Sequence, residues 1–145
     1  MRKVTIYTDG ACTGNPGPGG YGTILIHGVY RKELYGAEPH TTNNRMELLS
    51  AIVGLEALKE PCIVDLYSDS KYLVDAFNKN WLDDWQKNNW RRSNKKPVLN
   101  IGLWERLLPL TKKHTVNFHW IKGHSGNPEN ERCDALARYA IQSSA

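Results

Sequence analysis

Three strand-like segments precede the first helical pattern, and this order limits the fold more than any other feature of the chain. Residues 4–9 (VTIYTD) alternate between two faces, and residues 21–29 and 30–36 also have the composition of strands. Residues 43–60 then form an amphipathic helical pattern that Pro61 ends. Because short connections join the three strands, the sequence predicts an antiparallel meander before the first helix.

Strands and helices alternate through the rest of the chain. The pattern predicts a strand over 63–69, a helix over 70–80, a helix over 100–108, a strand over 115–121 and a helix over 127–142. Irregular, basic sequence rich in tryptophan extends to about residue 99, and the pattern allows one short additional helix in this stretch, between the helices over 70–80 and 100–108. Helical crossovers between strands require an α/β fold with a mixed sheet. With no linker or repeat in 145 residues, we expect a single domain over residues 1–145.

A glycine-rich stretch lies between the first two predicted strands. Residues 17–22 (GPGGYG) fit G-x-G-x-x-G, the phosphate-binding pattern of dinucleotide-binding folds. That function requires a helix after the glycines, so that the helix N-terminus meets the phosphate. Here the strand-like YGTILI follows. The stretch is therefore interpreted as a turn between antiparallel strands.

Cysteine spacing and charge indicate the environment of the protein. The three cysteines lie far apart, which favours reduced thiols over a disulfide framework or a zinc site. No signal-peptide core is present, so we expect a soluble, cytoplasmic protein without a membrane partner. Residues 71–122 hold eleven Lys or Arg and four Asp or Glu, against eight and eleven elsewhere. This division suits a polyanion held beside an acidic, cation-binding centre, with an ordinary basic surface as the alternative.

Two aspartates end predicted strands. Asp9 ends the first strand and Asp69 ends the strand over 63–69. Sites in open α/β sheets gather beyond the carboxyl ends of strands, so the two acids lie side by side if their strands are neighbours. The alternatives are a turn-forming role for Asp9 and a helix N-cap for Asp69.

Two further acids lie on predicted helices. Glu47 is on the apolar face of the helix over 43–60, where an unpaired carboxylate is costly to bury. The alternative is a capping box with Asn44. Asp134 flanks the apolar stripe of the last helix, four residues before Arg138, and a surface ion pair is its alternative role.

Oxygen ligands without thiolates suit Mg²⁺ or Mn²⁺. Carboxylates that hold two such ions support in-line displacement at a phosphodiester. His124, in KGHSGNP, has the chemistry to move protons for that reaction, although a loop histidine can also be simply solvated.

Four ordered blocks carry a resemblance to a known family. TDGACTGNPGPGGYG, TTNNRMELLSAI, YSDSKYL and WIKGHSGNPENERCDALAR are similar to the motifs of bacterial type 1 ribonuclease H. The resemblance implies the ribonuclease H-like fold, an α/β fold with a five-stranded mixed sheet flanked by helices. It implies endonucleolytic hydrolysis of the RNA strand of an RNA–DNA hybrid, with 5′-phosphate and 3′-hydroxyl products. It places the metal-binding, catalytic carboxylates at Asp9, Glu47, Asp69 and Asp134, and a catalytic histidine at His124.

The resemblance also implies substrate contacts. The residues that would read RNA 2′-hydroxyls match Cys12, Asn15, Asn43 and Asn44, and the DNA phosphate pocket matches Thr42 and Asn100. Helix capping is an alternative role for Asn43 and Asn44. A basic protrusion corresponds to 81–100 and would bind the DNA backbone through Trp81, Lys87, Arg91, Lys95 and Lys96. The spacing of Trp81 and Trp85 favours helix packing over base stacking.

Some positions depart from the family pattern. Lys71 stands where many relatives have a glutamine that contacts RNA. Asp83 and Asp84 add negative charge to the basic segment, and Asp65 lies in the middle of a predicted strand. Two other functions remain open: an integrase- or resolvase-like DNA nuclease with the same fold, and a non-catalytic hybrid-binding module. We expect the protein to act as a monomer.

Overall fold

The computed structural model describes residues 1–144, which form five strands and five helices. The strands are β1 (Arg2–Cys12), β2 (Gly17–His27), β3 (Tyr30–Thr41), β4 (Cys62–Ser68) and β5 (Thr115–Trp120). The helices are α1 (Asn43–Glu56), α2 (Lys71–Asn78), α3 (Trp81–Lys87), α4 (Ile101–Lys113) and α5 (Pro128–Ser143). Their order along the chain is the order that the sequence predicts.

The strands form one mixed sheet in the order β3-β2-β1-β4-β5. β1, β2 and β3 pair antiparallel, and β1, β4 and β5 pair parallel. The predicted meander and helical crossovers are therefore confirmed. The parallel pairing of β1 with β4 ends at Thr8 and Ser68, which defines the sheet end where the acids lie.

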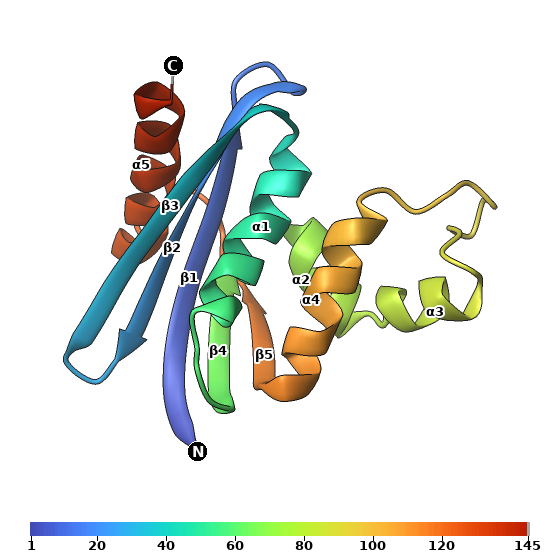
Figure 1. Cartoon of the computed structure of the whole chain (residues 1–145), viewed down its shortest axis with the longest axis horizontal. Helices are drawn as coiled ribbons and strands as arrows, with labels where there is room; N and C mark the ends of the chain where they lie inside the picture. Colours follow the sequence, from blue (N-terminus) through green and yellow to red (C-terminus); the bar gives the residue numbers. More distant parts are fainter. Residues whose placement is uncertain (145) are drawn as a thin grey trace.

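Helices cover the sheet unequally, as Figure 1 shows. α1, α2 and α4 lie on one side, and α5 alone lies on the other side, over β1, β2 and β3. The larger core forms where alternate residues of β1 and β4 meet α1 and α4, and it includes the fully buried Trp104. The smaller core joins Ile24 of β2 to Cys133 and Leu136 of α5.

Several boundaries differ from the sequence predictions. β1 continues to Cys12, so Asp9 lies inside the strand rather than at its end. α1 ends at Glu56, four residues before the predicted end. Residues 81–87 form α3, whose first turn carries Asp83 and Asp84. Acids in a first helical turn interact favourably with the helix dipole, which accounts for these charges in the basic segment.

The segment after α3 projects away from the sheet in Figure 1. It contains left-handed residues at Asn89, Trp90 and Lys95, and an isolated bridge joins Arg91 to Pro97. Within residues 1–144, no helix combines the length and the apolar composition that a membrane crossing needs.

Candidate active site

Asp9 and Asp69 come together where β1 and β4 separate. Asp69 directly follows the last parallel pair of these strands, and Asp9 directly follows its partner in β1. The condition for their proximity, neighbouring first and fourth strands, is therefore met. The proposed N-cap role of Asp69 is wrong, because Ser70 caps α2 and its hydroxyl accepts a hydrogen bond from the Leu73 N–H at 3.2 Å.

Glu47 reaches the same point from α1. Gly10 allows this approach, because a Cβ at that position would lie 2.6 Å from the backbone nitrogen of Glu47. The capping-box alternative for Glu47 is wrong. Thr42 is the N-cap of α1, and its hydroxyl accepts from the Arg45 N–H at 3.3 Å. Glu47 is only 2% exposed, and its Oε1 has no hydrogen-bond partner within the described chain.

The three carboxylates form one compact group. One oxygen from each of Asp9, Glu47 and Asp69 lies within 4.8 Å of the others. Burial, reinforced by the negative charge of Asp69, raises the pKa of Asp9 to about 8. Burial and the charge of Asp9 also raise the pKa of Glu47. A divalent cation fits this group, because it would neutralise the repulsion and give the unpartnered Glu47 oxygen a ligand.

Asp134 lies at the rim of the same cleft. It lines the cleft with the other three acids, but the 4.8 Å group identified among residues 1–144 does not include it. Its Oδ2 accepts a hydrogen bond from Nε of Arg138 at 2.9 Å. Asp134 therefore forms the expected ion pair with Arg138 and also lies beside the acid cluster.

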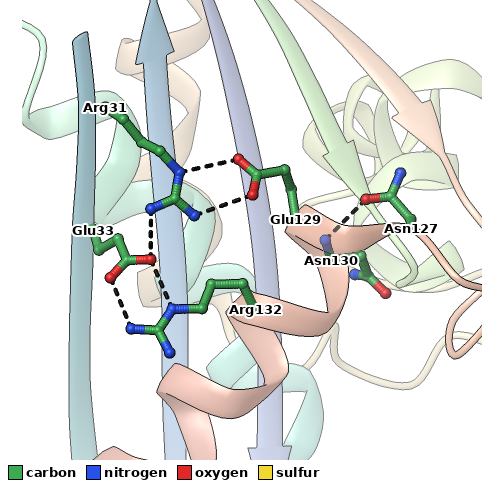
Figure 2. Close-up of polar contacts among 6 residues, drawn as sticks. All are labelled: Arg31, Glu33, Asn127, Glu129, Asn130 and Arg132. Carbon is green, nitrogen blue, oxygen red and sulfur yellow. Dashed lines mark hydrogen bonds and ion pairs between the residues drawn. The ribbon is translucent and has the colours of Figure 1, made fainter.

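Two features hold α5, which carries Asp134, against the sheet. The helix backbone approaches β2 so closely that a Cβ at Gly22 would overlap the carbonyl oxygen of Cys133. Figure 2 shows the second feature, a four-residue charge network between β3 and the start of α5. We call this group the α5 network, and it consists of Arg31, Glu33, Glu129 and Arg132.

The charges of the α5 network alternate in sign. Arg31 pairs with both carboxylate oxygens of Glu129 and with Glu33, and Arg132 pairs with both oxygens of Glu33. Hydrogen bonds from Arg132 are the largest of the effects that lower the pKa of Glu33 to about 2. As Figure 2 also shows, the Asn127 side chain caps the helix by accepting from the Asn130 N–H. These contacts fix the helix end from which Asp134 projects.

The acids open onto a cleft of about 470 Å³. Its wall contains His124, which lies on the loop between β5 and α5 with a left-handed φ of 52°. Predicted substrate-binding residues that also line the cleft are Cys12, Asn43, Asn44 and Lys71. Asn15 lies beside them, because its Oδ1 accepts from the Asn43 N–H at 2.9 Å. Side-chain capping by Asn43 or Asn44 is wrong, since Thr42 caps the helix.

The other predicted contacts do not line the cleft, although Asn100 bonds to a residue that does. The Asn100 side-chain amide donates to the Tyr72 hydroxyl at 3.2 Å. Trp81 is half-buried against the main core, and its ring lies 6.2 Å from that of Trp85. The remaining predicted basic contacts are exposed on α3 and the projecting segment. They are Lys87, Arg91, Lys95 and Lys96.

The sequence analysis missed Tyr72 and Trp120 near the site. Tyr72 lines the cleft, and its hydroxyl also accepts from the Trp104 indole at 3.2 Å. The sequence feature that could have indicated Tyr72 is its place in the first turn of the helix that follows Asp69. Asp65, which the strand pattern left unexplained, pairs with Nε2 of His119 at 2.8 Å.

Comparison with known proteins now decides the family. The family model described as RNase H matches residues 1–142. The chain belongs to the ribonuclease H family. The resemblance of the four sequence blocks is thereby confirmed.

Relatives within the ribonuclease H family align over nearly the whole chain. "Ribonuclease H" of Chlorobium limicola is 60% identical over 144 residues, which cover 99% of each chain. "Ribonuclease H" of Desulforamulus reducens is 58% identical over 137 residues, covering 94% of this chain and 86% of that protein.

Solved structures of the family have the same fold. LC9-RNase H1, described as a type 1 RNase H with the type 2 active-site motif, superposes with a TM-score of 0.89 at 31% identity. The match covers 100% of this chain and 74% of that chain. LC11-RNase H1 in complex with RNA/DNA hybrid matches with a TM-score of 0.75 at 24% identity, over 97% and 98% of the two chains.

Proposed function

We propose that the protein is a metal-dependent endoribonuclease that hydrolyses the RNA strand of RNA–DNA hybrids and leaves 5′-phosphate and 3′-hydroxyl ends. The observation that carries the proposal is the cluster of Asp9, Glu47 and Asp69 oxygens within 4.8 Å, in a chain of the ribonuclease H family. The solved complex of LC11-RNase H1 with an RNA/DNA hybrid supports the substrate class.

Divalent metal belongs to this proposal. Asp9, Glu47 and Asp69 would hold it, and Asp134 would contribute from the rim. We infer Mg²⁺ as the natural ion, with Mn²⁺ able to replace it and two ions present when substrate is bound. Such ions activate a water molecule and stabilise the departing oxygen.

His124 supplies the proton chemistry in the proposed reaction. Its imidazole lines the cleft on the loop that leads into α5. A histidine can accept and donate protons near neutral pH, and we assign its ring nitrogen to protonation of the departing 3′-oxygen. Asp9 and Glu47 lie on β1 and α1, and Asp69 directly follows β4, whereas the histidine is on a loop.

Both strands of the hybrid are recognised in this proposal. We assign contacts with the 2′-hydroxyls, which distinguish RNA from DNA, to Cys12, Asn15, Asn43 and Asn44, because they line the cleft or bond to a residue that does. Thr42 and Asn100 would hold a phosphate of the DNA strand. The exposed cations of the segment 81–100 would attract its backbone and make binding sensitive to salt.

Cleavage of strand-labelled substrates tests the proposal. With Mg²⁺ or Mn²⁺ we expect cuts in the RNA strand of a hybrid, and intact single-stranded RNA, duplex RNA and duplex DNA. Cleavage of duplex DNA that lacks ribonucleotides would instead indicate an integrase- or resolvase-like nuclease. Tight binding of the hybrid without cleavage in either metal would indicate a non-catalytic binding module.

A further inference from the structure

An aromatic ring and an ammonium group lie together beside the acid cluster. Lys71, the first residue of α2, places its Nζ 4.7 Å from the ring centroid of Trp120, at the end of β5. The Trp120 indole N–H donates to the backbone carbonyl of Asp69 at 3.0 Å. The same indole therefore binds the backbone of a cluster residue through its edge and carries a cation on its face.

The charges that line the cleft make Lys71 different from its neighbours. Four carboxylates line the cleft, together with two Lys or Arg residues, Lys71 and Arg138. Arg138 is paired with Asp134. Lys71 forms no ion pair with a carboxylate within residues 1–144. The Lys71 ammonium is therefore available to a negatively charged ligand that enters the cleft.

The indole face explains why this ammonium does not join the carboxylates. A lysine has a flexible four-carbon side chain, and Asp69 lies two residues away, so attraction would draw the ammonium into the cluster. Contact with the Trp120 ring offers a competing position at the rim. Trp120 is 44% exposed, so the ammonium on its face remains accessible to a large substrate.

We propose that Trp120 is a positioning residue that holds the Lys71 ammonium at the rim of the cleft, where it binds a backbone phosphate of the strand lying over the carboxylates. The inference rests on the proposed function and adds a contact to it. Trp120 acts through Lys71 in two ways: it presents a cation to the phosphate and keeps that cation out of the space between the carboxylates.

Hybrid binding in metal-free buffer tests the phosphate contact. Affinity would be measured between about 0.05 and 0.2 M salt for the wild type, Lys71→Met, Trp120→Leu and the double variant. We expect Lys71→Met to weaken binding about five- to tenfold and to reduce the salt slope by about one. Trp120→Leu should weaken binding about two- to fivefold, and the double variant should bind no worse than Lys71→Met. Lys32→Met, an exposed charge on β3 away from the cleft, should leave the slope unchanged.

The Mg²⁺ dependence of cleavage tests the positioning role separately. Without the indole, the Lys71 ammonium is expected to move toward Asp69, so Trp120→Leu should need a higher Mg²⁺ concentration for half-maximal activity. Adding Lys71→Met to Trp120→Leu should return that concentration to the wild-type value. A merely structural role for Trp120 would not produce this rescue. If Trp120→Leu fails to fold by circular dichroism, Trp120→Met, which also removes the aromatic face, replaces it in both assays.

Additive losses in the double variant, or unchanged salt slopes in both single variants, would overturn the inference. These outcomes are distinct from failure of the proposed function. If the wild type cleaves hybrids while the slopes are unchanged, only the role of Trp120 and Lys71 is lost. If the wild type cleaves no hybrid in Mg²⁺ or Mn²⁺, the proposed function itself fails.

Discussion

Carboxylates gather in two regions of this molecule, the acid cluster and the α5 network, and their surroundings differ in every electrostatic respect. In the cluster, Asp9 and Glu47 are buried beside a third acid. In the α5 network, each carboxylate lies between or beside arginines at the surface. The pKa of Asp9 is raised to about 8, whereas that of Glu33 is lowered to about 2.

The difference separates a functional arrangement from a stabilising one. Alternating charges with bidentate hydrogen bonds stabilise the packing of α5 on β3. Crowded charges of one sign cost free energy unless a cation or a proton is present. The cost of burying like charges together in the first region is therefore the physical signal that it could hold a metal ion.

The largest expected effect comes from removing a charge from the acid cluster. Asp9→Asn or Asp69→Asn should lower hybrid cleavage about 10³-fold, because the remaining carboxylates hold metal poorly. In metal-free buffer at about pH 9, above the pKa of Asp9, the same variants should melt several degrees higher, since repulsion between like charges is relieved. Cleavage rates and thermal melting would measure the two effects.

Asp65→Asn is the matched control for this experiment. Asp65 is an aspartate of β4, the strand that precedes Asp69, but it pairs with His119 away from the cluster, so its amide variant should cleave at nearly the wild-type rate. Near-normal turnover by Asp9→Asn and Asp69→Asn would contradict the role of the cluster.

An intermediate effect is expected from pH and metal together. Because the pKa of Asp9 is raised from 3.8 to about 8 in the fold, the native state retains a proton that the unfolded chain has lost between these values. Stability of the metal-free protein should therefore fall as pH rises through that window. Added Mg²⁺ should raise the melting temperature more at about pH 9 than at about pH 6, where a proton must be displaced. An equal rise in melting temperature on adding Mg²⁺ at both pH values would contradict this linkage. In Asp69→Asn, Mg²⁺ should no longer raise the melting temperature.

The smallest effect should come from the α5 network. Glu33→Gln should lower the free energy of unfolding by about 1 kcal/mol at neutral pH, because solvent screens the half-exposed arginines. The pKa of Glu33 is lowered from 4.5 to about 2, so its contribution is complete above pH 4.5 and is lost as pH falls through 2. Chemical denaturation at several pH values would measure the difference between the variant and the wild type.

Glu131→Gln, in the first turn of α5, controls for the loss of one negative charge from this surface. Glu131 makes no ion pair in the part of the chain that the structure describes, so this change should stay within about 0.5 kcal/mol. A Glu33 effect no larger than the Glu131 effect would show that the network adds nothing to stability.

The fold could be predicted from the sequence to the level of element order and sheet type. Residue periodicity indicated the meander and the crossovers, because hydrophobic spacing reports which face of an element is buried. The interpretation of residues 17–22 as a turn was wrong, since these glycine-rich residues begin β2. The short helix α3 could not be read from periodicity, since its seven residues pack tryptophans against a core formed by distant segments.

The candidate site was predictable in part for a similar reason. An acid on the apolar face of a helix, such as Glu47, can be recognised in the sequence, because burying a carboxylate costs free energy and no nearby residue offsets that cost. The cation–π contact of Lys71 with Trp120 and the pairing of Asp65 with His119 were not visible. Both join residues about fifty positions apart, which no local pattern relates.

By itself, the sequence determined which acids are candidates for the chemistry: spacing and charge indicated Asp9, Glu47 and Asp69, and the family resemblance added Asp134 and the basic segment. Only the tertiary structure decided which of those acids share a cation-sized space. It groups Asp9, Glu47 and Asp69, and it leaves Asp134 at the rim with Arg138. The physical reason is that periodicity sets the face on which a side chain lies, whereas the distance between two side chains depends on how closely whole elements pack, as at Gly10 and Gly22.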